Sequence, residues 1–330
     1  MKSIKKVLLV RFSSIGDMVL TSPAVRCIKQ QMPGVQLHYL TKKQYEPLLV
    51  ANPYIDKIFT IEKKVDEVLL ALKAENYDYV VDLHKNLRSM QVKRGLGVAA
   101  GSFNKLNVQK WLLTNFEINL LPQLHIVDRY FGALRKLGVE NDGRGLDYFI
   151  AESDRIVVVD FLPERFTNGY VVLVMGSKQA TKQIPHEKMM EIVDRLNKPV
   201  VLLGGPEDFT KAKLLAEALG NKVFNACGVL NVNQSASIIQ QGLCVITPDT
   251  GMMHIAAALK KKIISVWGNT IPGFGMYPYF PKGEENYRIV EVLNLNCRPC
   301  SKLGYKACPQ KHFKCMRNID VSEIMGATGL

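Results

Sequence analysis

The stretch KKVLLVRFSSIGDMVLTSP, residues 5–23, decides the fold. A short apolar run ends at Arg11, two serines follow, and Gly16 and Asp17 open a segment of helical composition. A buried strand that leads straight into a helix is the unit from which parallel sheets are built. Ligands bind at the carboxyl ends of the strands in such sheets. The sequence therefore places the Asp17 carboxylate where a ligand would lie.

The same alternation of strand-like and helix-like segments runs through both halves of the chain. Strands are expected over 6–11, 35–40, 57–61 and 79–82, and again over 170–175, 199–203, 243–247 and 263–267. The pattern stops over 140–168, a stretch with Gly, Asn, Asp, Pro and mixed charge. We therefore expect an α/β protein of two parallel-sheet domains, residues 1–160 and 161–330, that face each other across a cleft.

The composition limits the classes of partner. The chain has 330 residues, 47% of them hydrophobic, and a formal net charge of +13. The charge indicates an anionic partner such as nucleic acid, an acidic lipid surface or a phosphorylated substrate. No apolar run approaches the ~18 residues of a membrane span. The basic and then apolar start is too short for a signal peptide and lacks a cleavage site, so we expect a cytoplasmic protein.

Three loops after strands of the second half could hold a phosphorylated ligand. In PDTG, Thr250 and Gly251 begin a helix, whose free N–H groups attract anions. In GSKQATKQIP, Lys178 and Lys182 could neutralise a departing diphosphate. In GGPED, Gly204 and Gly205 would let a flat ring lie on the backbone, and Glu207 could accept from a ribose hydroxyl. The alternatives are an ordinary helix cap and solvated loop side chains.

Two groups in the first half could serve an acceptor. Asp17 could remove a proton from a hydroxyl, or it could merely complement the positive end of the helix dipole. His84, Lys85 and Arg88 follow a strand end and would suit an acidic acceptor, although a solvated loop is the alternative. No D-x-D pair of metal-binding carboxylates occurs in the loops at the strand ends. Its absence favours charge neutralisation by lysine and helix N-termini.

Four cysteines cluster near the end of the chain in a C-x₂-C-x₇-C-x₆-C pattern: Cys297, Cys300, Cys308 and Cys315. Four thiolates with one close pair could bind a structural Zn²⁺, but the spacing differs from that of a two-pair zinc ribbon. The alternative is a packed tail of reduced cysteines.

Several segments together resemble glycosyltransferase family 9, the ADP-heptose:lipopolysaccharide heptosyltransferases. They are VLLVRFSSIGDMVLTSPAVR (7–26), NPYIDKI (52–58), YDYVVDLHKNLRS (77–89), HIVDRYFGALRKLGV (125–139), TKQIP (181–185), LLGGPED (202–208) and TPDTGMMHIAAAL (247–259). The resemblance implies the GT-B fold, in which two Rossmann-like domains bind the acceptor and the nucleotide sugar, respectively. It also implies inverting transfer from an ADP-activated heptose, with no metal or other cofactor.

The resemblance also assigns roles to residues. Asp17 corresponds to the general base and Lys182 to a catalytic phosphate contact, with Ile184 where the family usually has tryptophan. The donor-binding set is Ser177, Lys178, Lys182, Gly204, Gly205, Glu207, Asp249, Thr250, Gly251, Met252 and His254. From their place at strand ends of the first half, and not from the resemblance, we expect an acceptor-binding set of Ser14, Gly16, His84, Lys85 and Arg88.

The partners that follow are an ADP-sugar, a lipid A–core saccharide acceptor and the anionic surface of the inner membrane, with no nucleic acid. The protein would then be a cytoplasmic enzyme bound peripherally to that membrane. Two alternatives belong to other classes. One is a different enzyme on the same fold, such as a nucleotide-sugar epimerase or a transferase of another sugar. The other is a basic, zinc-containing nucleic-acid binder.

Overall fold

The chain divides into two compact units. The computed structural model describes residues 4–330, so the first three residues of the predicted domain 1–160 lie outside it. The first unit comprises the chain up to Lys105 together with Leu124–Ala151. The second comprises Leu106–Gln123 and Glu152–Leu330. The predicted linker, 140–168, thus contains the junction between the units, and residues 106–123 belong with the second unit although they precede it in sequence.

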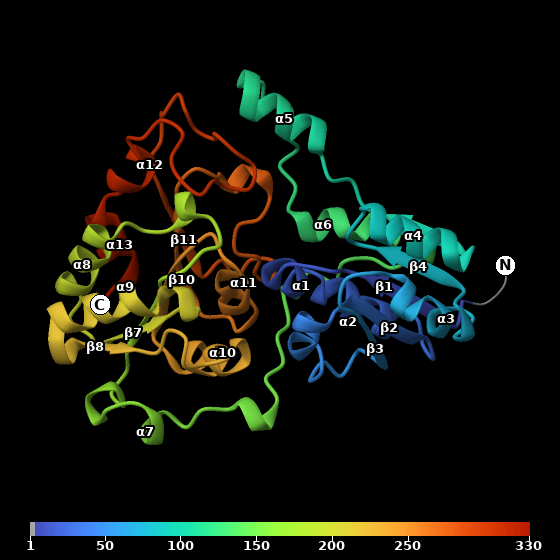
Figure 1. Ribbon diagram of the computed structural model, residues 1–330, viewed down its shortest axis with the longest axis horizontal. Coiled ribbons are helices and arrows are strands. Elements are labelled where there is room, and N and C mark those ends of the chain that lie inside the picture. Colours follow the sequence, from blue (N-terminus) through green and yellow to red (C-terminus); the bar gives the residue numbers. More distant parts are fainter. Residues whose placement is uncertain (1–3) are drawn as a thin grey trace. The chain divides into compact units, whose positions relative to one another are not determined.

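The first unit is built on a five-stranded parallel sheet (Figure 1). The strands are β1 (Lys6–Val10), β2 (Gln36–Lys42), β3 (Lys57–Ile61), β4 (Tyr79–Asp82) and β5 (Ala99–Ser102), in the order β3-β2-β1-β4-β5. The central strand β1 pairs with β2 on one side and β4 on the other. Near-continuous apolar runs such as KVLLV suit a strand that is buried on both faces.

Helices cover both faces of this sheet. They are α1 (Ile15–Val19), α2 (Ser22–Gln31), α3 (Asp66–Ala74), α4 (Leu87–Leu96) and α6 (Ile126–Phe131), with 3₁₀ turns η1 (Lys43–Leu48) and η2 (Arg135–Leu137). One core joins alternate strand residues, among them Leu8 and Val80, to Leu72 of α3 and Val92 of α4. Helices α2 and α6 contact each other, and α2 also contacts β2. Alternation along the strands supplies apolar side chains to both layers.

The second unit repeats this plan with six strands. They are β6 (Val171–Val174), β7 (Val200–Leu203), β8 (Val223–Asn225), β9 (Cys244–Pro248), β10 (Lys262–Trp267) and β11 (Tyr287–Glu291). All neighbours are parallel, in the order β11-β10-β9-β6-β7-β8. The predicted fold class, α/β with two parallel-sheet domains, is confirmed.

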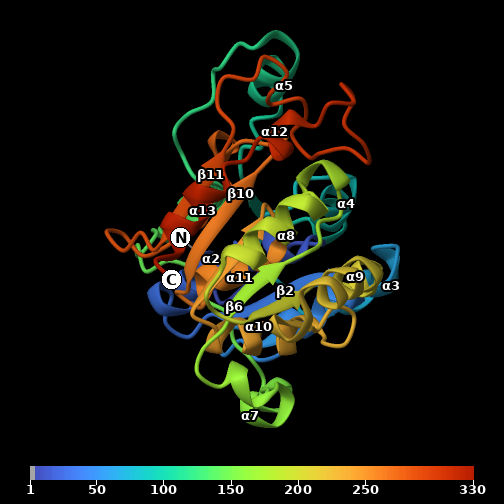
Figure 2. The same ribbon diagram turned by 90° about the vertical axis from the view of Figure 1, so that its left-hand side faces the viewer.

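The second unit also contains helices, several of which pack on its sheet. They are α5 (Asn107–Phe116), α7 (Val158–Phe161), α8 (His186–Arg195), α9 (Phe209–Leu219), α10 (Val232–Gln241), α11 (Gly251–Ala258), α12 (Lys314–Arg317) and α13 (Val321–Thr328), with 3₁₀ turns η3 (Glu152–Asp154), η4 (Glu164–Phe166), η5 (Ala180–Lys182), η6 (Pro206–Asp208), η7 (Gly220–Lys222) and η8 (Pro272–Phe274). Helices α13, α8 and α9 lie side by side in front of the strands in Figure 2. They share one core with Leu173 and Ile264. Helices α10 and α11 contact each other, and α11 contacts β9 and β10.

The segment after β1 forms two helices rather than one. In the structure α1 ends at Val19, and α2 begins after the N-cap residue Thr21, with Pro23 in its first turn. Proline is tolerated there because the first N–H groups of a helix have no partner within it.

Candidate active site

The loop between β1 and α1 holds Asp17 by one of its two carboxylate oxygens. Oδ2 accepts from the Ser14 backbone N–H at 3.1 Å and from the Ser14 hydroxyl at 2.9 Å, and it lies 2.6 Å from a terminal nitrogen of Arg11. Within residues 4–330, no hydrogen bond to Oδ1 is found. Gly16 is buried in the first turn of α1, where its carbonyl accepts from the N–H of Leu20. Asp17 is therefore fixed in position and keeps one oxygen for a further hydrogen bond.

The charge of Asp17 is balanced within the first unit. Burial works to raise the pKa of Asp17, but Arg11 and the two Ser14 hydrogen bonds outweigh it and hold the pKa below its ordinary value. Asp17 is thus ionised at neutral pH. Arg11 is itself held by hydrogen bonds to the carbonyls of Ser13 (2.6 Å) and Leu83 (2.5 Å). Sequence reasoning missed the pairing of Arg11 with Asp17, because six positions along an irregular loop do not fix where a side chain points.

His84 lies beside this pair. Its ring meets Phe12 edge to face, with centroids 5.4 Å apart. Its Nδ1 atom is buried and has no hydrogen-bond partner among the described residues. Burial first, and then the charges of Arg11 and Lys105, lower the pKa of His84 to about 4. The imidazole is therefore neutral at pH 7 and can accept or donate one hydrogen bond, but it supplies no positive charge.

A buried carboxylate that the sequence analysis did not single out shapes the next loop. Asp82 closes β4 and accepts from the backbone N–H groups of His84 (3.0 Å) and Lys85 (2.6 Å). It also receives the Ser89 hydroxyl at 2.9 Å and the Lys93 ammonium at 2.8 Å. Asp82 therefore fixes the loop from which His84 projects.

The two basic residues of this loop differ from His84 in exposure. Lys85 is exposed, with a left-handed φ of 50°. Arg88 is exposed at the start of α4, and its Nε donates to the carbonyl of Lys63 at 3.0 Å. The strand order places the β1 and β4 loops side by side at the carboxyl edge of the sheet. The first unit thus brings Ser14, Gly16, Asp17 and His84 into one neighbourhood, with Lys85 and Arg88 at its border.

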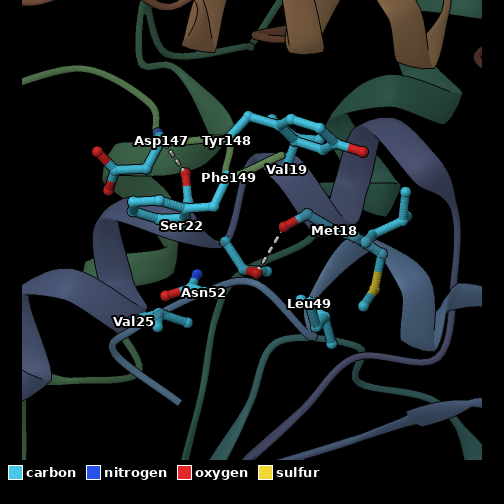
Figure 3. Close-up of a pocket in the computed structure, with 11 residues that line it drawn as sticks. Met18, Val19, Ser22, Val25, Leu49, Asn52, Asp147, Tyr148 and Phe149 are labelled. Carbon is cyan, nitrogen blue, oxygen red and sulfur yellow. Dashed lines mark hydrogen bonds between the residues drawn. The ribbon is translucent and has the colours of Figure 1, made fainter. Parts of the chain in front are cut away.

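A small cavity lies behind α1 in the first unit (Figure 3). Its volume is about 10 Å³, and its lining includes Met18, Val19, Leu49 and Phe149. This is the space of roughly one water molecule. The hydroxyl of Ser22, also in the lining, accepts from the Asp147 N–H at 2.9 Å. The cavity is too small for a substrate and is a packing defect beside α1.

In the second unit, four loops meet at the carboxyl edge of the sheet. Strands β10, β9, β6 and β7 are consecutive neighbours, so the loops that follow them lie next to each other. Three of these loops carry the predicted donor residues. The fourth, after β10, was missed.

Lys182, Asp249 and Thr270 form the centre of this edge. The Lys182 ammonium lies 2.5 Å from Asp249 Oδ2, which also accepts from the Thr270 hydroxyl at 3.0 Å. The side chains of Lys182 and Asp249 are 16% and 12% exposed. Asp249 therefore orients Lys182 and does not cap the following helix.

Helix α11 begins beside this ion pair. Thr250 is its N-cap residue and makes no side-chain capping bond; its hydroxyl lies 3.2 Å from that of Thr247. Gly251 and Met252 in the first turn are partly exposed, whereas His254 is buried. The first N–H groups of a helix have no partner within it and present partial positive charge. An anion could be bound at this helix start next to Lys182.

The two remaining donor loops are held by local contacts. The Ser177 carbonyl accepts from the Gln183 side chain at 2.9 Å, while Lys178 is exposed. The backbone at Gly204 lies close to Asp208, whose carboxylate accepts from the Gly205 N–H at 3.0 Å. Asp208 is buried, whereas Glu207 is exposed and its carboxylate lies against Gly205. The two neighbouring acids thus have different tasks.

The structure brings the four thiols of the cysteine-rich tail into one neighbourhood, because the charges of Cys297, Cys300 and Cys308 all act on the Cys315 thiol. Within residues 4–330, no group of three or more His, Cys, Asp or Glu side chains is arranged to hold a metal ion. Cys297 lies 3.8 Å from the Nε2 atom of His312, and burial raises the pKa of the Cys315 thiol to about 11.

The tail also supports the carboxyl edge of the second sheet, a role that sequence analysis missed. Arg298 is almost fully buried and donates to the carbonyls of Gly268 (2.5 Å) and Thr270 (2.9 Å). It also pairs with Glu291. The N–H of Tyr305 donates to the Thr181 hydroxyl at 2.8 Å. Both contacts support the residues that surround Lys182.

Comparison with known proteins identifies the family. Residues 67–311, well over half of the chain, match the family described as Glycosyltransferase family 9 (heptosyltransferase). Lipopolysaccharide heptosyltransferase 1 of Escherichia coli K12 is 26% identical over 293 residues, which cover 81% of this chain and 89% of that protein. Lipopolysaccharide heptosyltransferase 3 of the same strain is 25% identical over 284 residues, or 77% and 80% of the two chains.

Solved structures support the fold. A family 9 glycosyltransferase from Veillonella parvula superposes with a TM-score of 0.73 at 22% identity, covering 89% of this chain and 88% of that one. E. coli heptosyltransferase WaaC with ADP gives a TM-score of 0.69 at 21% identity, covering 97% and 98%. The chain therefore belongs to glycosyltransferase family 9, the heptosyltransferase family, and is a transferase.

Proposed function

We propose that this transferase moves a heptose from ADP-heptose to the inner core of a lipopolysaccharide acceptor, with inversion at the anomeric carbon and without a metal ion. The observation that carries the proposal is the pairing of Lys182 with Asp249 beside the start of α11, in a chain of the heptosyltransferase family. Its relatives support the donor and the acceptor: two of them are lipopolysaccharide heptosyltransferases, and the similar E. coli heptosyltransferase WaaC is solved with ADP.

The second unit would bind the donor. The free N–H groups at Thr250 and Gly251 and the ammonium of Lys182 are suited to the diphosphate. The exposed Glu207 carboxylate would accept hydrogen bonds from the ribose, and the Gly204–Gly205 backbone would lie against the adenine ring. Ser177, Lys178, Met252 and His254 complete the donor-binding set.

The first unit would bind the acceptor and supply the base. Asp17 Oδ1 takes the proton of the acceptor hydroxyl as the hydroxyl oxygen bonds to the anomeric carbon. The bond from that carbon to the β-phosphate oxygen breaks on the opposite face, and the electron pair leaves with ADP. A single displacement of this kind inverts the anomeric configuration. The neutral His84 and the hydroxyl of Ser14 would orient the acceptor, and Lys85 and Arg88 would face its acidic groups.

Charge neutralisation by the protein supports the metal-independent part of the proposal. Negative charge develops on the departing diphosphate, and preorganised positive groups stabilise it most when they are already in place. Asp249 and Thr270 hold Lys182 in a partly buried position, so little reorganisation is needed. In this arrangement the Lys182 ammonium and the N–H groups at the start of α11 would contact the departing phosphate directly, in place of a divalent cation.

The proposed place of action is the cytoplasmic surface of the inner membrane. The acceptor is anchored in a membrane by its lipid, and the net charge of +13 would attract the protein to an anionic leaflet. Within residues 4–330, none of the helices is both long and apolar enough to cross a bilayer. Binding would therefore be peripheral.

A melting screen followed by a transfer assay tests the proposal. We expect ADP-heptose to raise the melting temperature, and UDP- and GDP-sugars to have little effect. Transfer to a lipopolysaccharide core acceptor should persist in excess EDTA, and proton NMR of the product should show inverted anomeric configuration. Release of free sugar without an acceptor, or stabilisation by another nucleotide sugar alone, would contradict the proposal.

A substitution of Lys182 tests its role. Lys182→Ala should weaken binding of ADP and lower kcat, because the departing charge loses its partly buried counterion. Lys213→Ala, at an exposed lysine of α9, is the matched control and should leave both unchanged. Isothermal titration measures the ADP affinity of each variant, and initial-rate kinetics measure its kcat. Equal ADP affinity in the two variants would remove Lys182 from the donor site.

A further inference from the structure

Helix α5 presents large apolar side chains to solvent. Val108, Trp111 and Phe116 are 67%, 54% and 57% exposed. Val108 and Trp111 lie three residues apart and so share a face of the helix. The rings of Trp111 and Phe116 meet with centroids 5.1 Å apart. Ile118 and Leu120, just beyond the helix, are also exposed. Such a concentration of exposed apolar groups usually marks an interaction surface.

A strongly basic segment lies in the same unit. Residues 292–319, which we call the basic segment, contain six Lys and Arg residues and no Asp or Glu. At its turn Lys302, Leu303, Tyr305 and Lys306 are all exposed, Leu303 by 64%. Two lysines, one leucine and one tyrosine are therefore exposed within residues 302–306.

Both features are attached to the loop after β10. The Lys110 ammonium of α5 lies 5.6 Å from the ring centroid of Phe274. Arg298 of the basic segment donates to the carbonyls of Gly268 and Thr270 in the same loop. Figures 1 and 2 show α5 and the coil of the basic segment, drawn in red, at the same end of the second unit.

We propose that α5 and the basic segment together form a docking surface for an anionic lipid bilayer. Tryptophan and tyrosine favour the membrane interface, where the ring is buried and its polar edge stays wet. Lysines near the surface add attraction to anionic headgroups. Nucleic acid would leave the exposed Val108 and Leu303 without a role. The unbalanced positive charge favours an anionic surface over a purely apolar protein partner.

This inference rests on the proposed function, which identifies the membrane as the anionic inner membrane. It adds which surface of the protein contacts that membrane. Its test uses vesicles of phosphatidylcholine with and without phosphatidylglycerol, free of nucleotide sugar and glycolipid. Trp267 is 1% exposed, so a change of tryptophan emission reports Trp111. We expect cosedimentation and a blue shift only with phosphatidylglycerol, both falling as salt rises.

Variants locate the surface. Trp111→Ala should weaken cosedimentation, and Lys302→Gln with Lys306→Gln should weaken it about fivefold for each charge removed. The matched controls are Leu70→Ala, at a residue 82% exposed on α3 of the first unit, and Lys213→Gln with Lys260→Gln, which remove the same charge from exposed positions of the second unit outside the loop after β10. Both controls should bind like the unmodified protein.

Three outcomes would overturn the inference: equal binding by Trp111→Ala and Leu70→Ala, binding to pure phosphatidylcholine, or self-association without lipid that shields Trp111 from a quencher. Failure of the proposed function is distinguishable. If vesicles bind but no nucleotide sugar is used, the proposed function fails alone. If a soluble core saccharide is glycosylated but vesicles do not bind, the docking surface fails alone.

Discussion

At the scale of single residues, the two oxygens of Asp17 differ in what they do. Oδ2 is held by Ser14 and Arg11, and Oδ1 is left for a ligand. The same contacts that lower the pKa of Asp17 also make it a weaker base, so its advantage would come from position and permanent ionisation rather than from basicity.

Asp17→Asn tests this division. The amide keeps the size of the side chain but cannot accept the hydroxyl proton. We expect kcat to fall on the order of 10²–10⁴-fold. ADP affinity should be unchanged, because the proposed nucleotide contacts belong to the other unit. Steady-state kinetics and ADP titration on one preparation measure both quantities.

Stability provides the control for Asp17→Asn. Loss of the carboxylate also removes the partner of the buried Arg11, so some fall in melting temperature is expected. A near-normal kcat together with a lowered melting temperature would mean that Asp17 only supports the turn, and the assignment as base would be wrong.

His84 predicts a pH dependence of stability. Its pKa is about 4 in the folded protein and near 6.5 when unfolded, so the unfolded chain binds the proton more tightly. The contribution of the neutral His84 to the free energy of unfolding is therefore full above pH 6.5, and it is lost as the pH falls towards 4. The carboxylates of Asp17 and Asp82, whose pKa values are lowered from 3.8, titrate below this window.

Urea unfolding at pH 7, 6 and 5 checks this expectation. His84→Asn should flatten the decline between pH 7 and 5 relative to the unmodified protein. His38 has a pKa lowered by burial and contributes with the same sign, so His38→Asn is measured in parallel. An unchanged pH slope in His84→Asn would contradict the burial of its imidazole.

At the scale of elements, apolar runs predicted most strands, whereas the side-chain contacts of the polar loops were not predicted. The strands Lys57–Ile61 and Tyr79–Asp82 have the predicted bounds. Strand β5, with sequence AAGS, was missed because it has almost no apolar signal and lies at the sheet edge. Loop positions could be predicted from topology, but side-chain pairings such as Lys182 with Asp249 could not, because they depend on rotamers and on neighbours far apart in sequence.

The support that the tail gives to the carboxyl edge of the second sheet predicts a large effect of Arg298→Met. Methionine would leave the partly buried Glu291 without its counterion and two carbonyls of the β10 loop without a donor. Loss of one partner of such a pair costs about 3–5 kcal/mol. ADP affinity should also fall, since Thr270, held by Arg298, supports Asp249.

Arg288→Met is the matched control for Arg298→Met. Arg288 pairs with Glu323 on the surface, and its side chain is 64% exposed. The change should stay within about 1 kcal/mol of the unmodified protein. Urea unfolding and ADP titration compare the two variants. Similar stabilities would show that Arg298 does not support the carboxyl edge of the second sheet.

At the scale of the whole molecule, the sequence predicted the fold class and the family, but not the division of the chain. Alternating segments with a break over 140–168 were enough to predict two parallel-sheet units. It could not be predicted that residues 106–123 belong to the second unit, because this depends on the tertiary contacts of a helix that precedes that unit in sequence. The family match begins at residue 67, so the role of Asp17 depends on geometry and on the experiment above.

The separate cores of the two units predict how ADP changes unfolding. Each unit has its own sheet and apolar core, and both tryptophans of the chain, Trp111 and Trp267, belong to the second unit. Tryptophan emission therefore reports the second unit, whereas far-UV circular dichroism reports both. ADP at 100 times its Kd stabilises the unit that binds it by about 2.7 kcal/mol. For a unit of this size, that raises the melting temperature by roughly 5–10 °C.

We expect ADP to raise the transition seen by tryptophan emission and to leave a separate component of the circular dichroism curve in place. Lys182→Ala should reduce the shift at the same ADP concentration, because the proposed phosphate contact is lost. A shift confined to the component that tryptophan does not report would assign the nucleotide to the first unit. That result would reverse the proposed roles of the two units, since Asp17 would then lie on the donor side.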